Sequence, residues 1–259
     1  MTLALLGLVA LLAFTVEATA GFGSVVVALT LAAWFLPIDR VLVSLLPVNV
    51  LLSGYLTLRY RRDVDGRVLA RRVFAWMVPG MLLGMAPAAL VGVWPGLAGG
   101  AGTGDLIRGV FAAFVVALAA GELWRARQGT TADTRALPAP VAATALVGAG
   151  VVHGLFACGG PLLVYVVGRE LTDKARFRAT LSAVWLLLNA ALLVPRLAEG
   201  ALDREALTGS GVMLVSLVGG LAIGERLHHR LPVARFRIAV FALLLVAGLA
   251  LLARSVRGE

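Results

Sequence analysis

The chain has 259 residues, of which 60 % are hydrophobic and 14 % are charged, and its mean hydropathy is +0.95. Because soluble proteins carry about 25 % charged residues, this composition excludes a water-soluble domain and predicts an all-α polytopic membrane protein. The net charge of +9 does not indicate nucleic-acid binding, since no basic stretch is interleaved with aromatic residues. A single cysteine excludes an internal disulfide and a multi-cysteine metal site, and we expect no metal and no cofactor.

Eight apolar runs, separated by charged or Pro/Gly-rich connections, are predicted to be helical. They cover residues 1–36, 41–58, 73–94, 106–124, 139–168, 179–196, 206–224 and 236–253. Several are close to the ~20 residues that cross a bilayer. The first and fifth runs are longer, and a continuous helix over the first would measure about 54 Å against a hydrocarbon core of about 30 Å. Glycines interrupt both, at "AGFGS" (20–24) and "ACGGP" (157–161), so we predict two broken or re-entrant helices.

Residues that match between the two halves of the chain keep the same order, at displacements of 130 to 140 positions. The pairs include Glu17 with His153, Gly23 with Gly159, Asn49 with Asn189, and Gly80-x-x-x-Gly84 with Gly220-x-x-x-Gly224. We therefore predict a duplication, with a first repeat at 1–128, a polar linker at 129–137 and a second repeat at 138–259. The first run imitates a signal peptide, but its internal counterpart indicates that it is retained.

Basic residues in the connections predict the orientation of the repeats. The connection after run two carries six arginines, and those after runs one and three carry one each. In the second half, the connections after runs five and seven carry four basic residues each, and that after run six carries two. If runs one and five dip in and return, the two sides hold 17 and 6 basic residues, whereas simple crossings by all eight runs give 13 and 10. The first arrangement obeys the positive-inside rule, and it predicts inverted-topology repeats of about four segments each, with both termini on the non-cytoplasmic side.

The two breaks are typical of a transporter site. Discontinuous helices in inverted repeats place half-helix N-termini at the middle of the membrane, where they attract anions. Ser24 is a candidate N-cap for the first short arm, and Pro161 suits the start of the second. Gly21, Gly23, Gly159 and Gly160 can adopt positive φ and let a ligand approach the backbone; the alternative is that they only allow close helix packing. The two Gly-x-x-x-Gly motifs are interpreted as packing motifs.

The remaining polar residues near the breaks are candidates for binding or coupling. Glu17 and His153 precede the two breaks by four residues. They either couple transport to protons or sense the substrate, or each caps or braces its own broken helix. Cys158 lies inside the second break and either contacts a soft sulfur anion or fills space as a small apolar residue. Asn49 and Asn189 either bind substrate oxygens or hydrogen-bond between helices.

The stretch "GAGVVHGLFACGGPLLVYVVGRELTDKARFRATLSAVWLLLNAALL" resembles the second-half signature of the sulfite exporter TauE/SafE-like permeases. "EATAGFGSVVVALTL" and "RLPVARFRIAVFALLLVAGLALL" are similar to other parts of that family. Gly154, Gly159 and Gly160 match the family's glycine-rich motif. The chain departs from the family pattern at Ala157, Cys158 and Pro161, and in the first half at Ser24. The resemblance implies a multi-pass carrier of the bacterial inner membrane for sulfite, an organosulfonate or thiosulfate.

The leading hypothesis is a secondary transporter, and specifically an exporter, that alternates access around the two breaks and uses protons or sodium as coupling ion. Its expected partners are a small anionic substrate and the lipid bilayer, with a homodimer as one option for assembly. One alternative is an anion channel of the same architecture. Others are a membrane-embedded enzyme that uses Cys158 and His153 and a scaffold subunit. We do not expect an enzyme, and no Walker A motif is present.

Overall fold

A computed structural model describes residues 1–91, 103–128, 137–230 and 233–257 of the chain, and all regular structure in these ranges is helical. The predicted all-α fold is therefore confirmed. The elements are α1 Thr2–Ala20, α2 Ser24–Ala32, α3 Ile38–Arg59, the single turn η1 Arg61–Asp63, α4 Gly66–Val68, the π-helical η2 Leu69–Met77, α5 Val78–Val91, α6 Thr103–Arg127, α7 Ala139–Phe156, α8 Gly160–Glu170, α9 Lys174–Ala198, α10 Arg204–Arg230 and α11 Val233–Arg257.

Seven stretches of these described residues are long and apolar enough to cross a membrane. They are Thr2–Ala20, Ile38–Arg59, Gly66–Ala86, Gly109–Arg127, Ala139–Phe156, Lys174–Ala198 and Arg204–Arg230. A shorter apolar stretch lies at Phe241–Ser255 within α11. Each of the eight predicted apolar runs thus corresponds to one or two helices. The chain has the helices of a polytopic membrane protein.

The chain forms two compact units. The first unit contains Met1–Leu42, Pro95–Thr131 and Thr208–Glu259, and the second contains Val43–Trp94 and Ala132–Leu207. Each unit combines one broken helix with segments from the other half of the sequence, since α1 and α2 share a unit with most of α10, and α7 and α8 share one with α5. The predicted repeat boundaries stay a prediction, and residues 129–136 of the predicted linker lie outside the described residues.

In the second unit, α8 folds back along α7 and makes a helical hairpin. A Cβ at Gly159 would lie 2.3 Å from the carbonyl oxygen of Ala149, which is almost three turns earlier on α7, and Leu162 lies beside Gly148. In the first unit, α2 likewise packs on α1, and a Cβ at Gly23 would lie 3.3 Å from the Val16 side chain. The prediction of two interrupted helices is confirmed, and both interruptions are tight turns.

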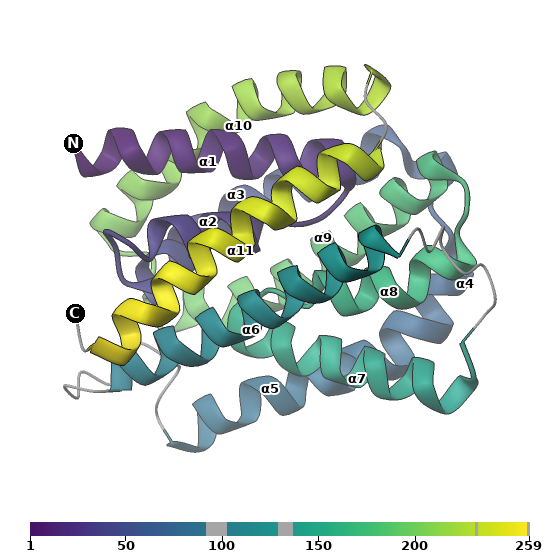
Figure 1. Cartoon of the computed structure of the whole chain (residues 1–259), viewed down its shortest axis with the longest axis horizontal. Helices are drawn as coiled ribbons and strands as arrows, with labels where there is room; N and C mark the ends of the chain where they lie inside the picture. The colour runs from purple at the N-terminus through teal and green to yellow at the C-terminus, as the bar shows by residue number, and fades with distance from the viewer. Residues whose placement is uncertain (92–102, 129–136, 231–232, 258–259) are drawn as a thin grey trace. The chain divides into compact units, whose positions relative to one another are not determined.

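The glycine motifs bring each hairpin's long arm against a helix of the other half. A Cβ at Gly80 would lie 2.2 Å from the carbonyl oxygen of Val147 on α7, and one at Gly84 would lie 2.3 Å from that of Val151. Figure 1 shows α5 and α7 side by side within this unit. In the first unit, a Cβ at Gly224 of α10 would meet Ala18 of α1 at 2.4 Å. The interpretation of both motifs as packing motifs is confirmed.

Candidate functional site

The first break is a two-glycine turn between α1 and α2. Gly21 has φ 84°, and its N–H donates to the carbonyl oxygen of Glu17 at 2.7 Å. Gly23 has φ 108°. Because residues with a Cβ avoid this left-handed region, both glycines are required by the turn, as predicted from the sequence.

The second break reaches the same geometry with a different residue. Ala157 has φ 54°, and its N–H donates to the carbonyl oxygen of His153 at 2.7 Å. Gly159 has φ −67° and Gly160 is the first residue of α8, so the expectation that these glycines would use positive φ is wrong. Gly159 is instead required for close packing, because a Cβ there would also lie 2.9 Å from the Cβ of His153 and from Cε of Met77.

The two breaks therefore correspond in detail. In each, a left-handed residue ends the long arm and returns its N–H to the carbonyl of the residue four positions before it, which is Glu17 in α1 and His153 in α7. Glu17 belongs to the first unit and His153 to the second. The same local turn thus occurs at two positions 136 residues apart, and the repeat itself stays a prediction.

At the first break, the N-terminus of the short arm already contacts a carboxyl group of the protein. The buried carboxylate of Glu17 accepts hydrogen bonds from the hydroxyl and from the backbone N–H of Ser24, the first residue of α2. Ser24 was expected to be the N-cap, but Gly23 occupies that position, and the Ser24 hydroxyl turns to the carboxylate. A carboxylate at a helix N-terminus satisfies free N–H groups and complements the helix dipole.

At the second break, no such carboxylate is present among the described residues. The N-cap of α8 is Gly159, which has no side chain to accept the free N–H groups. His153 is fully buried, and neither of its ring nitrogens has a hydrogen-bond partner in the described structure. Its ring stacks on Trp185 of α9, with centroids 5.7 Å apart and planes inclined by 25°. A buried polar side chain without a partner costs free energy, so this position suits a ligand.

Three more candidates lie in the second unit. Cys158 is a free, buried thiol inside the break. Asn189 is buried one turn after Trp185 on α9, and its Oδ1 has no partner in the described structure. Asn49 is buried in α3 and makes other contacts.

Sequence reasoning missed two residues that hold the first hairpin. His228 of α10 donates from Nδ1 to the carbonyl oxygen of Thr19 at 2.7 Å, near the C-terminal end of α1. The hydroxyl of Thr19 lies 3.3 Å from the carbonyl oxygen of Gly224. His228 follows the Gly220-x-x-x-Gly224 motif by four residues, so a helical wheel places it on the packing face, and this spacing was an available signal.

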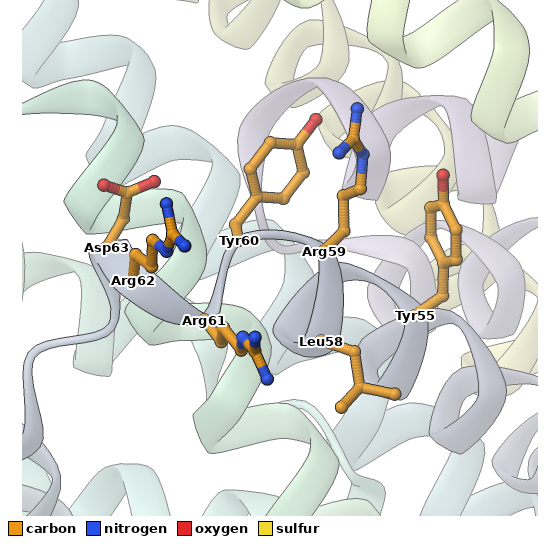
Figure 2. Close-up of a pocket in the computed structure, with 7 residues that line it drawn as sticks. All are labelled: Tyr55, Leu58, Arg59, Tyr60, Arg61, Arg62 and Asp63. Carbon is orange, nitrogen blue, oxygen red and sulfur yellow. The ribbon is translucent and has the colours of Figure 1, made fainter.

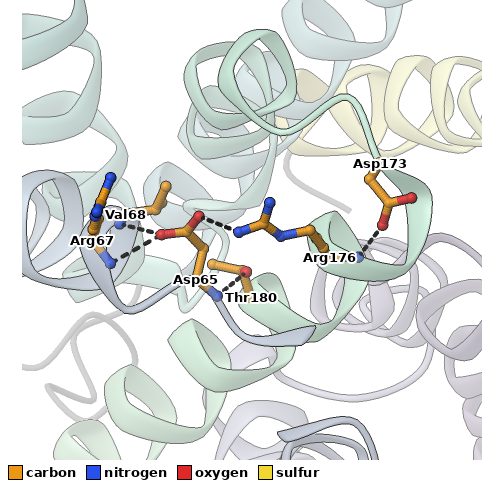
Figure 3. A network of polar contacts seen from close by, with 6 residues as sticks. All are labelled: Asp65, Arg67, Val68, Asp173, Arg176 and Thr180. Atoms are coloured by element: carbon orange, nitrogen blue, oxygen red, sulfur yellow. Dashed lines mark hydrogen bonds and ion pairs between the residues drawn. The ribbon is translucent and has the colours of Figure 1, made fainter. Parts of the chain in front are cut away.

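Polar contacts also order the basic connections of the second unit (Figure 3). The carboxylate of Asp65 accepts from the backbone N–H groups of Arg67 and Val68 and pairs with the Arg176 guanidinium at 3.0 Å. The Asp65 N–H donates to the Thr180 hydroxyl at 2.9 Å. These bonds join the connection after α3 to the start of α9.

The sequence matches the family model described as Sulfite exporter TauE/SafE over residues 6–251. A curated relative, the "Probable inner membrane transporter protein TsaS" of Comamonas testosteroni, is 28% identical over 191 residues, which cover 70% of this chain and 73% of the relative. No solved structure matches the chain.

Proposed function

The chain belongs to the sulfite exporter TauE/SafE family, a family of membrane transporters, and we propose that it exports a small sulfur-containing anion across the bacterial inner membrane. The proposed substrate class is taken from the family's description, and the proposed location in the inner membrane is taken from the name of the Comamonas relative. Sulfite, an organosulfonate and thiosulfate are the candidate substrates. The transporter works as a secondary carrier that alternates access around the two breaks.

The substrate anion binds at the second break, and His153 is the observation that carries this proposal. Two short arms present helix N-termini, but that of α2 is occupied by the Glu17 carboxylate. The N-terminus of α8 has no side-chain cap, and His153, whose Cβ packs against Gly159, is a buried imidazole without a hydrogen-bond partner in the described structure. An anion there gains the helix dipole and a hydrogen bond from His153. Gly159 and Gly160 let it approach the backbone, and Cys158 and Asn189 complete the surroundings.

In this scheme, the first break couples transport of the anion to the binding of a proton. A proton on Glu17 neutralises the carboxylate that holds the N-terminus of α2, and the turn at Gly21, Gly23 and Ser24 is then available to a substrate anion. Glu17 and His153 are therefore the proposed proton-coupling residues, and Asn49 is a proposed binding residue on α3. The proton is the coupling ion that these side chains support, with sodium as the alternative.

The test is sulfite transport by purified protein in proteoliposomes, with thiosulfate and taurine as further substrates. His153→Phe keeps an aromatic ring beside Trp185 and removes both nitrogens. Loss of a hydrogen bond to a charged group costs about 1.5–3 kcal/mol, so we expect transport to fall about tenfold or more. His229→Phe is the matched control, because the His229 side chain is 74% exposed. Equal transport by both variants would remove His153 from the site.

The same assay separates the alternatives. A carrier saturates with sulfite and responds to an imposed proton gradient, whereas an anion channel does neither over the same range. Cys158→Ser tests the thiol, and full transport by this variant would exclude both a thiol contact with the substrate and a thiol-based enzyme.

A further inference from the structure

A pocket opens at the C-terminal end of α3, within the second unit and away from both breaks along the chain. It has a volume of about 580 Å³ and is lined by Tyr55, Leu58, Arg59, Tyr60, Arg61 and Arg62, with Asp63 at its end. Figure 2 shows Tyr55, Arg59 and Tyr60 pointing to one side of the turn, and Leu58 and Arg61 to the other. The transport proposal does not use any of these residues.

The pocket lies at the end of a helix that is long and apolar enough to cross a membrane. The apolar stretch Ile38–Arg59 ends there, and its last turn exposes 49% of Tyr55 and 72% of Leu58. Arg61 and Arg62 follow at once and are exposed. Tyrosine is enriched at the level of lipid headgroups, and arginines beyond the end of a helix reach the same level. The lining thus changes from apolar to cationic over about two helical turns.

The basic side chains that line the pocket outnumber the acidic ones. Arg61 and Arg62 have no ion pair in the described part of the chain, and Asp63 is the one acidic residue of the lining. The ring of Tyr60 lies 6.0 Å from the Arg59 guanidinium carbon and 5.0 Å from that of Arg178, so a fourth arginine is held nearby. Two other charged residues of the connection are paired, Asp65 with Arg176 and Arg72 with Glu170.

We propose that this pocket binds the phosphate headgroup of an anionic phospholipid, with an acyl chain against Leu58, which points to the same side of the turn as Arg61. Arginine guanidinium groups bind phosphate oxygens through two parallel hydrogen bonds. Basic pockets at the cytoplasmic ends of membrane helices bind anionic headgroups in this way. The exposed Leu58 side chain distinguishes a lipid from a free anion, because inorganic phosphate would leave it uncovered.

The experiment measures thermal unfolding of the detergent-purified full chain in mixed micelles that contain phosphatidylglycerol, phosphatidylcholine or inorganic phosphate. The test variant is Arg61→Gln/Arg62→Gln. The control is Arg67→Gln/Arg71→Gln, which removes the same charge from exposed residues of the same connection, outside the pocket. At about 1 kcal/mol for each arginine, the test variant should need about tenfold or more phosphatidylglycerol for half-maximal stabilisation, whereas the control should resemble the wild type.

Three outcomes would overturn the proposal. Equal losses in the two variants would indicate attraction by surface charge alone. An unchanged test variant would remove the arginines from the site, and equal stabilisation by inorganic phosphate or phosphatidylcholine would exclude an anionic lipid. If the double variant is lost during purification, Arg62→Gln against Arg67→Gln gives the same comparison with a smaller expected change of about fivefold.

Discussion

At the scale of single residues, Ala157 carries the most unusual backbone. It is the one residue other than glycine with positive φ among the described residues. Its N–H completes the turn that ends α7, so the conformation is imposed by the break. A left-handed conformation costs an L-residue with a Cβ about 1–2 kcal/mol. Gly21 holds the same position in the first break without that cost.

Exchanging the two residue types should therefore change stability in opposite directions. Ala157→Gly relieves the left-handed strain but adds about 0.4–1 kcal/mol of chain entropy to the unfolded state. We expect a net stabilisation of about 0.5–1 kcal/mol, or a rise in Tm of about 2 °C. Gly21→Ala should lower Tm by a similar amount. Thermal unfolding of both variants in one detergent checks this, and shifts of the same sign would contradict it.

The sequence could predict these breaks but not the residue that makes each turn. Glycine clusters in long apolar runs identified both interruptions, because an uninterrupted helix would exceed the bilayer. At the second break the clustered glycines serve packing, and the turn falls on an alanine. Which residue turns depends on how α8 returns along α7, with Gly159 against Ala149. That is a tertiary contact, and local sequence does not determine it.

The sequence likewise could not predict the contacts that the Glu17 and His153 side chains make. Their spacing before the breaks indicated equivalent positions, and the structure gives their carbonyls equivalent roles. Their side chains differ, because Ser24 satisfies Glu17 while His153 has Trp185 beside it and no hydrogen-bond partner in the described structure. Hydrogen-bond partners depend on the folded chain. The sequence alone therefore could not decide whether Glu17 and His153 brace their helices or couple transport to protons.

At the scale of elements, the hairpins depend on backbone-to-backbone packing without side chains between. Gly150 and Gly154 of α7 face the helix formed by η2 and α5, just as Gly80 and Gly84 face α7. A Cβ at Gly150 would lie 2.1 Å from the carbonyl oxygen of Met77, closer than any real contact. The sequence identified the glycine motifs but not their partners, because spacing along a helix defines a face and not the element that packs on it.

Two neighbouring glycines of α7 offer a matched test of this packing. Gly150→Ala must push α7 away from Met77 and Met81, and overpacking of this kind costs about 1–3 kcal/mol. A Cβ at Gly148 would lie an ordinary 3.7 Å from the nearest atom of Leu162, so Gly148→Ala should change stability by less than about 0.5 kcal/mol. Thermal unfolding and folded yield measure the difference, and equal behaviour of the two variants would show that α5 and α7 are not in close contact.

At the scale of the whole molecule, the two halves of the sequence are interlaced. α1 of the first half packs on α10 of the second, and α7 of the second half packs on α5 of the first. Neither half contains all the contacts of its own broken helix. The predicted repeats follow the order of the sequence, whereas each compact unit combines several helices from both halves. Hydropathy along the sequence can locate the helices. It cannot predict which helices share a compact unit, because that depends on long-range contacts.

The hairpin shape bears on how the chain crosses the membrane. If the α1–α2 and α7–α8 hairpins each enter and leave on one side, the connections hold 17 basic residues on one side and 6 on the other. Positive charge is retained in the cytoplasm, so the connection after α3 should be cytoplasmic and both termini should face outward. Simple crossing by every apolar run would distribute the charge almost evenly and would place the termini on the same side as that connection.

Cysteine labelling decides between these arrangements, because Cys158 is the single cysteine of the chain and is buried. In a Cys158→Ser background, Thr2→Cys and Arg67→Cys place a thiol at exposed positions of the N-terminus and of the connection after α3. A membrane-impermeant maleimide added to intact spheroplasts should label the first variant, and it should label the second only after the membrane is permeabilised. Labelling of both variants from one side would mean that the two hairpins cross the membrane and do not return. The inverted orientation of the repeats would then be contradicted, because it is inferred from the charge bias that returning hairpins produce.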